Sequence, residues 1–222
     1  MTGATVLIPV DGDAFLGGDL ATPHESSGIV VFAHGSGSSR ASPRNRLVAQ
    51  ELHRSGVATV LVDLLTAEEE RADARTGEHR FDIALLARRV ERVVEWVGEH
   101  PGLCDLPLGL FGASTGAAAA LVVAARRPDR VTTVVSRGGR PDLAGDALGQ
   151  VSVPTLLIVG SHDLEVLEMN RTAARDLSGE ARIEIVERAT HLFEEPGALE
   201  QVASLAAGWF SRHLRPTGAV DA

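Results

Sequence analysis

Ser114 lies at the centre of the segment best suited to carry out chemistry. The segment reads Gly112-Ala-Ser-Thr-Gly116, with an apolar run before it and four alanines after it. A serine on a tight turn between a strand and a helix presents its hydroxyl above the sheet edge, and glycines two positions to either side avoid collisions in that turn. The start of the following helix favours negative charge. The pattern therefore predicts a nucleophilic serine.

A serine hydroxyl is activated by a base, and the base is oriented by a third group. Asp163 follows the apolar run Thr155–Val159, and His191 follows the run Ile183–Val186. These positions place both residues at the same sheet edge as the serine, in the chain order serine, acid, histidine. We therefore predict Ser114 as nucleophile, His191 as base and Asp163 as the orienting acid.

Neighbouring residues offer alternatives for two of these roles. His162 is a second histidine, but it adjoins Asp163 and cannot easily turn back onto it. Glu165 or Asp142 could replace Asp163 as the acid, because either carboxylate could orient an imidazole. The sequence favours Asp163 and leaves the two other acids open.

An acyl-transfer site also needs donors for the developing oxyanion. The N–H of Thr115, at the start of the helix, is the first predicted donor. The second is expected from the loop that begins at His34, where we favour the N–H of Ser36, and where Gly35 lets the backbone approach the substrate. His34 is predicted to brace this loop by hydrogen bonding. A dinucleotide-binding loop is disfavoured because Arg40 occupies the position of the third glycine.

Arg137 is a candidate for substrate binding. It follows the apolar run Val131–Val135 and is expected at the carboxyl edge of the sheet, where ligands of such sheets bind. A guanidinium there could hold a substrate carboxylate. The competing interpretation is a surface or structural arginine.

The elements that must position these residues alternate along the chain. Apolar β-branched runs alternate with segments of helical periodicity, which predicts an α/β fold with a parallel sheet covered on both faces. The charged stretch 66–80 is interpreted as a surface loop or a partly helical excursion. The predicted strands are Thr5–Val10, Phe15–Thr22 (antiparallel to the first), Gly28–Ala33, Val57–Val62, Leu106–Phe111, Val131–Val135, Thr155–Val159 and Ile183–Val186, and the predicted helices are Asn45–Ser55, Ile83–His100, Thr115–Arg127, Val166–Leu177 and Pro196–Leu214.

Composition narrows the classes of function. The formal charge of −9 disfavours a nucleic-acid partner, and the absence of lysine excludes Schiff-base and P-loop chemistry. Cys104 is the single cysteine, so neither an internal disulfide nor a cysteine-rich zinc site can form. No signal peptide and no apolar run of about 18 residues is recognisable. We expect a cytoplasmic protein without metal, cofactor or membrane partner, and a homodimer is left open.

Taken together, the motifs resemble the α/β-hydrolase superfamily and, within it, the dienelactone hydrolase-related families. The resemblance covers nearly the whole chain and rests on four segments, His34–Gly37, Gly112–Gly116, Gly160–Asp163 and Ala189–Phe193. It implies a mostly parallel eight-stranded sheet with helices on both faces. From the length and the pattern of elements we expect one domain over residues 1–215, followed by a flexible tail at 216–222.

The resemblance also implies hydrolysis of a carboxylic ester or lactone without a cofactor. Dienelactone hydrolases proper carry a cysteine nucleophile where this chain has Ser114, so a more general carboxylesterase is favoured. The segment Ser136–Val153 is too short for a large helical cap, which predicts an open site for small soluble acyl compounds. Acyl transfer, thioester hydrolysis or peptide cleavage would use the same triad, and a binding protein with vestigial turnover is the alternative from another class. Similar proteins sometimes occur fused to phosphoribosyltransferase domains, which nothing in this chain supplies.

Overall fold

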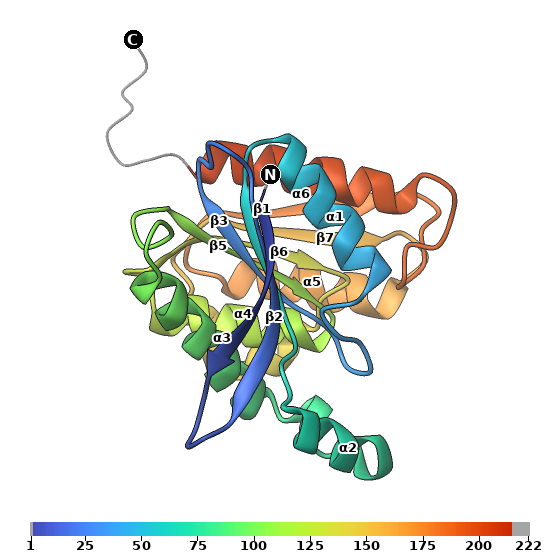
Figure 1. The fold of residues 1–222 in the computed structure, drawn as a ribbon. Coiled ribbons are helices and arrows are strands. Elements are labelled where there is room, and N and C mark those ends of the chain that lie inside the picture. Colours follow the sequence, from blue (N-terminus) through green and yellow to red (C-terminus); the bar gives the residue numbers. More distant parts are fainter. Residues whose placement is uncertain (1, 215–222) are drawn as a thin grey trace.

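A twisted eight-stranded sheet runs through the centre of the protein, which a computed structural model describes over residues 2–214 (Figure 1). The order of these strands is β1-β2-β4-β3-β5-β6-β7-β8. Strand β2 is antiparallel to both of its neighbours, β1 and β4, and all other neighbouring strands are parallel. The predicted tail at 216–222 lies outside the described residues. The strands are β1 (Thr2–Pro9), β2 (Phe15–Thr22), β3 (Ile29–Ala33), β4 (Ala58–Val62), β5 (Leu108–Ala113), β6 (Val131–Arg137), β7 (Thr155–Gly160) and β8 (Ala181–Val186).

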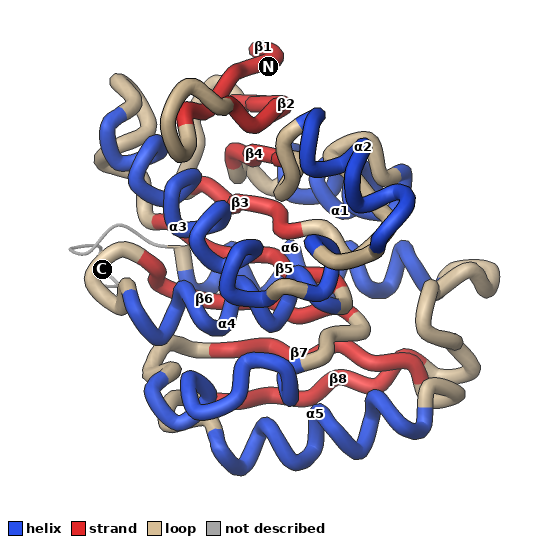
Figure 2. The backbone as a smooth tube through the Cα atoms, turned by 90° about the horizontal axis from the view of Figure 1, so that it is seen from below, coloured by secondary structure: helices blue, strands red, loops and turns tan. Residues whose placement is uncertain are grey.

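Helices cover both faces of this sheet (Figure 2). Helices α1 and α6 pack together on one face, and α3, α4 and α5 lie on the other with the 3-10 segment η2. This is the doubly covered α/β architecture that the alternation of elements predicts, and no separate cap domain is present among residues 2–214. The helical elements are α1 (Pro43–Arg54), α2 (Ala67–Thr76), η1 (His79–Phe81), α3 (Ile83–Glu99), α4 (Thr115–Arg126), η2 (Pro141–Gln150), α5 (Leu164–Asp176) and α6 (Ala198–His213).

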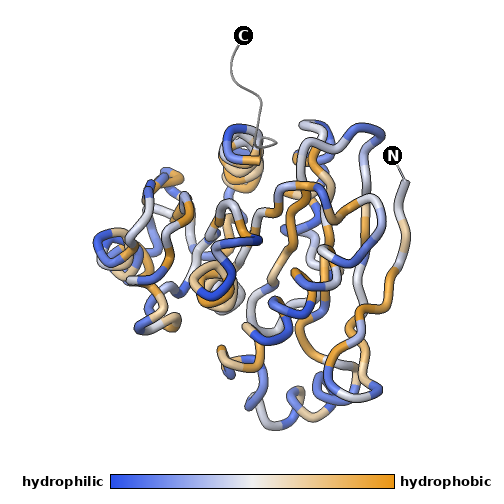
Figure 3. Tube along the Cα trace, turned by 90° about the vertical axis from the view of Figure 1, so that its left-hand side faces the viewer, coloured by the Kyte–Doolittle hydropathy of each residue, from blue (hydrophilic) through white to orange (hydrophobic). Residues whose placement is uncertain are grey.

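The central strands are apolar because both of their faces are covered. Every residue of β3, β4, β5 and β7 is buried, and the apolar segments gather in the interior of the trace (Figure 3). Phe32 and Phe111 pack ring against ring across β3 and β5, with centroids 4.8 Å apart. Trp209 of α6 donates to Thr133 Oγ1 at 2.7 Å, which satisfies a buried indole N–H. Each face of the sheet therefore has its own core.

The charged stretch 66–80 contains helix α2, so the interpretation as a surface loop is wrong and that as a helical excursion is confirmed. A capping box starts the helix, because the Glu69 N–H donates to Thr66 Oγ1 at 3.2 Å while the Thr66 N–H donates to Glu69 Oε2 at 2.8 Å. The buried residue of this helix is Asp73, so polar contacts rather than apolar packing attach the helix to the rest of the protein. The segment η2 was also not predicted. The other predicted boundaries differ by at most three residues.

Arg89 of α3 connects α2 with the edge hairpin. Its guanidinium is buried and binds Glu69 of α2 at 2.7 Å and Asp11, in the β1–β2 turn, at 3.0 Å. Asp73 is similarly bound by Arg80 at 2.6 Å. The sequence contains the Thr and Glu of the capping box. A helix attached by ion pairs, however, lacks the apolar stripe from which a helix is usually predicted.

Helix α4 begins in direct contact with the end of β3. A Cβ atom on Gly116 would lie 2.3 Å from the carbonyl oxygen of Ala33 and 2.4 Å from that of His34. A Cβ atom on Gly112 would lie 2.3 Å from the Cα atom of Ala117. Both glycines of the Gly-x-Ser-x-Gly pattern are therefore required by backbone packing.

We expect Gly116→Ala to lower the free energy of unfolding by about 1–3 kcal/mol, because the backbones of α4 and β3 must move apart. Gly208→Ala is the matched control. Gly208 lies inside α6 with open space around it, so alanine there should raise stability by roughly 0.5–1 kcal/mol. Urea unfolding followed by circular dichroism measures both changes, and equal midpoints for the two variants would contradict the packing argument.

Candidate active site

Ser114 occupies the sharp turn between β5 and α4. Its backbone has φ 50° and ψ −120°, a conformation uncommon for a residue with a side chain. Hydrogen bonds hold it on both sides, because the Ser114 N–H donates to the Arg137 carbonyl at 3.3 Å and the Arg140 N–H donates to the Ser114 carbonyl at 3.2 Å. Ser114 thus has the strained backbone expected of a serine nucleophile on a strand-to-helix turn.

His191 and Asp163 form a close hydrogen-bonded pair. Nδ1 of His191 lies 2.6 Å from Oδ2 of Asp163. A carboxylate oxygen only accepts, so Nδ1 carries the proton and Nε2 is left as the basic nitrogen. The side chain of Asp163 is 15% exposed and that of His191 is 38% exposed. The carboxylate is therefore enclosed while the imidazole reaches the surface.

The segment after β6 brings this pair next to Ser114. A Cβ atom built on Gly138 would lie 3.5 Å from Nδ1 and Cε1 of His191, so the imidazole rests on the Gly138 backbone. The preceding residue, Arg137, accepts the Ser114 N–H through its carbonyl. Ser114, Asp163 and His191 thus follow three different strands and lie at one edge of the sheet.

The alternative residues are placed differently. Asp142 is bound by the guanidinium of Arg140 at 2.7 Å, and Glu165 and His162 are exposed. Among residues 2–214, the His191 side chain is hydrogen-bonded to Asp163 and to none of these alternatives. The geometry favours Asp163 as the acid that orients His191.

His34 braces the loop that follows β3, as its position predicts. Its Nδ1 lies 2.9 Å from the Gly35 carbonyl oxygen, and its Nε2 accepts the Leu64 N–H at 3.0 Å. These two bonds require the neutral ring with a proton on Nδ1. Burial lowers the pKa of His34 below its ordinary value. The loop is therefore held by an uncharged histidine.

The predicted oxyanion donors lie together, with one contact that the sequence did not reveal. The Ser36 N–H donates to Thr115 Oγ1 at 3.0 Å, across 79 positions of sequence. The Ser36 N–H can donate to a substrate oxyanion only after its bond to the Thr115 hydroxyl is broken. Gly35 lies close to Ser114, because a Cβ atom there would be 3.1 Å from the Ser114 Cβ. The two donor assignments stay predictions.

A cavity of about 430 Å³ opens beside Gly35 and Ser36. It is bounded by the loop after β3, the start of α1 and helix α2, which projects from the body in Figure 1. Its volume lies within the range of small-molecule sites. The charged side chains that line it are Arg44, Asp63, Glu70, Asp73 and Arg80.

Arg137 lies at the carboxyl end of β6 and is 8% exposed, so the surface interpretation is wrong. Its Nε and Nη1 atoms are buried without a hydrogen-bond partner. Burial, and secondarily the charge of Arg44, lowers the pKa of Arg137 to about 10. The guanidinium stays charged at neutral pH and has no carboxylate that neutralises it in the described part of the chain.

Other chemistry-bearing features lie apart from this edge. Cys104 is half-buried in the turn between α3 and β5. Within the described range 2–214, no cluster of three or more histidine, cysteine, aspartate or glutamate side chains is arranged to hold a metal. None of the helices described here has the length and hydropathy needed to cross a membrane.

Comparison with known proteins shows which family this chain belongs to. The family described as alpha/beta hydrolase domain matches residues 26–204. Two proteins of Mycobacterium tuberculosis, each named a phosphoribosyl transferase, are 57% identical over 205 residues, which is 92% of this chain. The chain spans 45% of the length of those relatives.

Solved structures agree with this placement. A dienelactone hydrolase from Anabaena variabilis is 55% identical and superposes with a TM-score of 0.94, covering 96% of this chain and 99% of that one. The esterase domain of a Rhodothermus marinus protein is 17% identical, with a TM-score of 0.74 over 96% of this chain and 100% of that one. The second likeness concerns the fold alone.

The neutral state of His34 predicts a pH dependence of stability. Because its folded-state pKa is lowered, the unfolded state binds more protons at mildly acidic pH, and the contribution of His34 is lost as the pH falls below the ordinary histidine range. We expect the loss of unfolding free energy in His34→Gln, relative to wild type, to be larger at pH 7.5 than at pH 5. Urea titrations at the two pH values measure it, and an equal loss at both would argue against the neutral brace.

Proposed function

Because this chain belongs to the α/β-hydrolase family and is related to the dienelactone hydrolases, we propose that it is a serine hydrolase that cleaves carboxylic esters or lactones of small soluble substrates. The observation that carries the proposal is the 2.6 Å contact between His191 Nδ1 and Asp163 Oδ2, at the sheet edge where Ser114 occupies its strained turn. In these roles Ser114, His191 and Asp163 would supply the nucleophile, base and orienting acid that acyl transfer through serine requires.

In the proposed reaction, Nε2 of His191 takes the proton of the Ser114 hydroxyl as its oxygen attacks the ester carbonyl. Asp163 keeps the proton on Nδ1 and stabilises the imidazolium that forms. The Thr115 N–H donates to the oxyanion, and the Ser36 N–H joins it when its bond to Thr115 Oγ1 is exchanged. His191 returns the proton to the leaving alcohol, and water then releases the acyl group by the same steps.

The size and openness of the site support small substrates. The cavity of about 430 Å³ adjoins Ser36, and within the described residues no cap domain covers it. The name of the tuberculosis relatives describes proteins more than twice as long as the matched region, so phosphoribosyl transfer is not part of the proposal. Acyl transfer and thioester hydrolysis by the same residues are the competing chemistries. Acyl transfer differs in the group that accepts the acyl from the enzyme, and thioester hydrolysis differs in the leaving group, which is a thiol.

A fluorophosphonate probe tests the nucleophile directly. We expect wild-type protein to be labelled and to hydrolyse 4-nitrophenyl acetate, and Ser114→Ala to lose both properties, because only an activated serine attacks the probe. Intact-mass spectrometry follows the labelling and absorbance follows the hydrolysis. Labelling without turnover would favour a binding protein with vestigial activity, and unlabelled wild type would overturn the assignment of Ser114.

Asp163→Asn tests the orienting acid. An amide in place of the carboxylate no longer stabilises the required tautomer of His191, so kcat should fall on the order of 10³- to 10⁴-fold. Asp142→Asn is the matched control, because Asp142 is bound to Arg140 rather than to His191, and its kcat should change by about twofold or less. Equal effects of the two substitutions would contradict the assignment of Asp163.

A further inference from the structure

The loop between β8 and α6, residues 187–197, carries His191 and has a strained backbone. Arg188 and Phe193 have φ angles of 62° and 55° in this loop, and the third non-glycine residue with positive φ among residues 2–214 is Ser114. Such conformations cost free energy and persist only where the surrounding contacts determine them. The contacts that hold this loop therefore decide where the imidazole of His191 lies.

Two buried residues anchor the loop on either side of His191. Ala189 is fully buried, and its carbonyl accepts the His162 N–H at 3.0 Å. Phe193 is 2% exposed and packs in the core that α6 shares with the sheet. These anchors fix the two sides of the loop and leave residues 190–192 between them, so the position of His191 depends on what holds that short segment.

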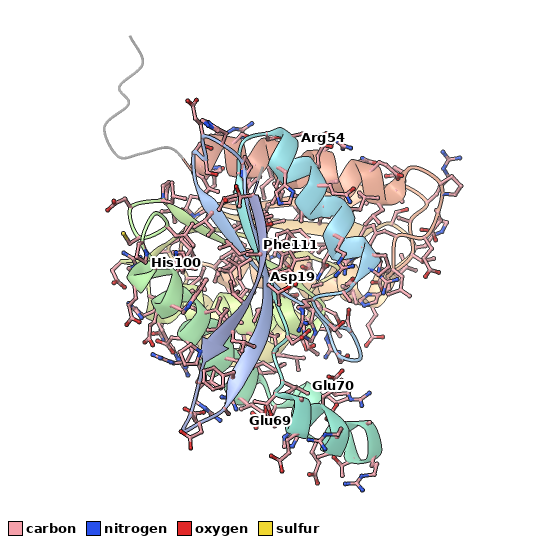
Figure 4. All side chains as sticks on the ribbon, viewed as in Figure 1. Asp19, Arg54, Glu69, Glu70, His100 and Phe111 are labelled. Carbon is pink, nitrogen blue, oxygen red and sulfur yellow. The ribbon has the colours of Figure 1, made fainter. Side chains whose placement is uncertain are left out.

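The side chain of Glu195 holds the segment between these anchors. Unlike the exposed carboxylate of Glu70 on α2 (Figure 4), that of Glu195 turns back onto its own loop. Its Oε1 accepts the Thr190 N–H at 3.1 Å and the Thr190 hydroxyl at 2.6 Å. The Thr190 carbonyl in turn accepts the Phe193 N–H at 3.2 Å. Thr190, the residue next to His191, is thus bound through its N–H, its hydroxyl and its carbonyl.

Glu195 holds Thr190 as an ionised carboxylate. The hydrogen bond from the Thr190 hydroxyl is the largest of the influences that lower the pKa of Glu195 below its ordinary value. Hydrogen bonds to an ionised group are shorter and stronger than those between neutral groups. The neighbouring Glu194 is placed differently, because its side chain is 68% exposed and its carboxylate lies 3.6 Å from Arg44. Of these two adjacent glutamates, Glu195 is the one hydrogen-bonded to the loop within residues 2–214.

A movement of Thr190 would displace the imidazole that follows it in the chain. Nδ1 of His191 lies 2.6 Å from Oδ2 of Asp163, and its ring rests on the backbone of Gly138. A displacement of about 1 Å at a reacting group can lower a rate about a hundredfold. A loop places such a group less precisely than a strand or helix unless its neighbours fix it. The carboxylate that binds Thr190 is therefore suited to fix the position of His191.

We infer that Glu195 is a positioning residue for His191. Its carboxylate holds Thr190 and thereby keeps the imidazole bonded to Asp163, with Nε2 free to act as the base. Glu195 acts through the backbone of the loop and takes no part in bond cleavage. Its effect on the rate rests on the proposed hydrolase function, whereas its effect on the bond between His191 and Asp163 requires no turnover.

The kinetic test compares the two adjacent glutamates in the hydrolysis of 4-nitrophenyl acetate. We expect Glu195→Ala to lower kcat by about tenfold or more and to change KM by about twofold or less, because the base is displaced while the groups that bind substrate are not. Glu195→Gln should recover much of the lost rate, since its amide oxygen still accepts from Thr190. Glu194→Ala is the matched control, and its kcat should change by about twofold or less. Equal kcat values for Glu195→Ala and Glu194→Ala overturn the inference.

A measurement without turnover separates this inference from the hydrolase proposal. In Ser114→Ala, the proton that His191 Nδ1 donates to Asp163 should give a far-downfield proton NMR signal, because a carboxylate acceptor deshields it. The signal is assigned by its loss when His191→Gln is added. Adding Glu195→Ala should shift or broaden the signal, and adding Glu194→Ala should leave it unchanged.

The outcomes distinguish a positioning role from a merely structural one. A signal that Glu195→Ala leaves unchanged, even with a lowered midpoint of urea unfolding, would show a structural carboxylate and overturn the inference. The absence of the signal in Ser114→Ala would also overturn it. If the signal responds as expected but the wild type hydrolyses no ester, the hydrolase proposal fails while the positioning of His191 by Glu195 stands.

Discussion

The approach of helix α4 to the end of β3 is the contact on which the candidate active site depends. Gly116 allows the first turn of α4 to touch the carbonyl groups of Ala33 and His34, and no side chain could replace its hydrogen atom without moving a backbone. The same contact sets the turn at Ser114, brings Thr115 against Ser36 and fixes the wall of the neighbouring cavity. Backbone packing, rather than a set of side-chain bonds, therefore holds Ser114 and the loop that faces it in one geometry.

Around that contact, hydrogen bonds hold the remaining groups in defined protonation states. Two opposite bonds to the ring of His34 require it to be neutral, and the carboxylate of Asp163 requires the proton of His191 to be on Nδ1. Arg137 is the exception, because it is buried and its Nε and Nη1 have no hydrogen-bond partner among residues 2–214.

Much of this arrangement could be predicted from the sequence, for physical reasons that differ between elements. The parallel strands were predictable because strands buried on both faces must be apolar throughout, and the turn at Ser114 because its packing admits only glycine at two fixed positions. Helix α2 was only partly predicted because ion pairs attach it and leave no periodic apolar face. The bond between Ser36 and Thr115 was not predictable because it joins residues that only the folded chain brings together.

The manner in which α2 is attached has a consequence for how this protein can evolve. The helix forms one wall of the cavity, yet its buried residue is Asp73 and its anchors are ion pairs from Arg80 and Arg89 rather than side chains of either core. Substitutions on its cavity-facing side can change the shape and charge of the site without opening holes in the packed interior. The lining of the cavity and the packing of the two cores thus depend on largely separate parts of the chain. Sequences descended from this one can therefore change what the cavity accepts through substitutions in α2, while the packing around the sheet stays the same.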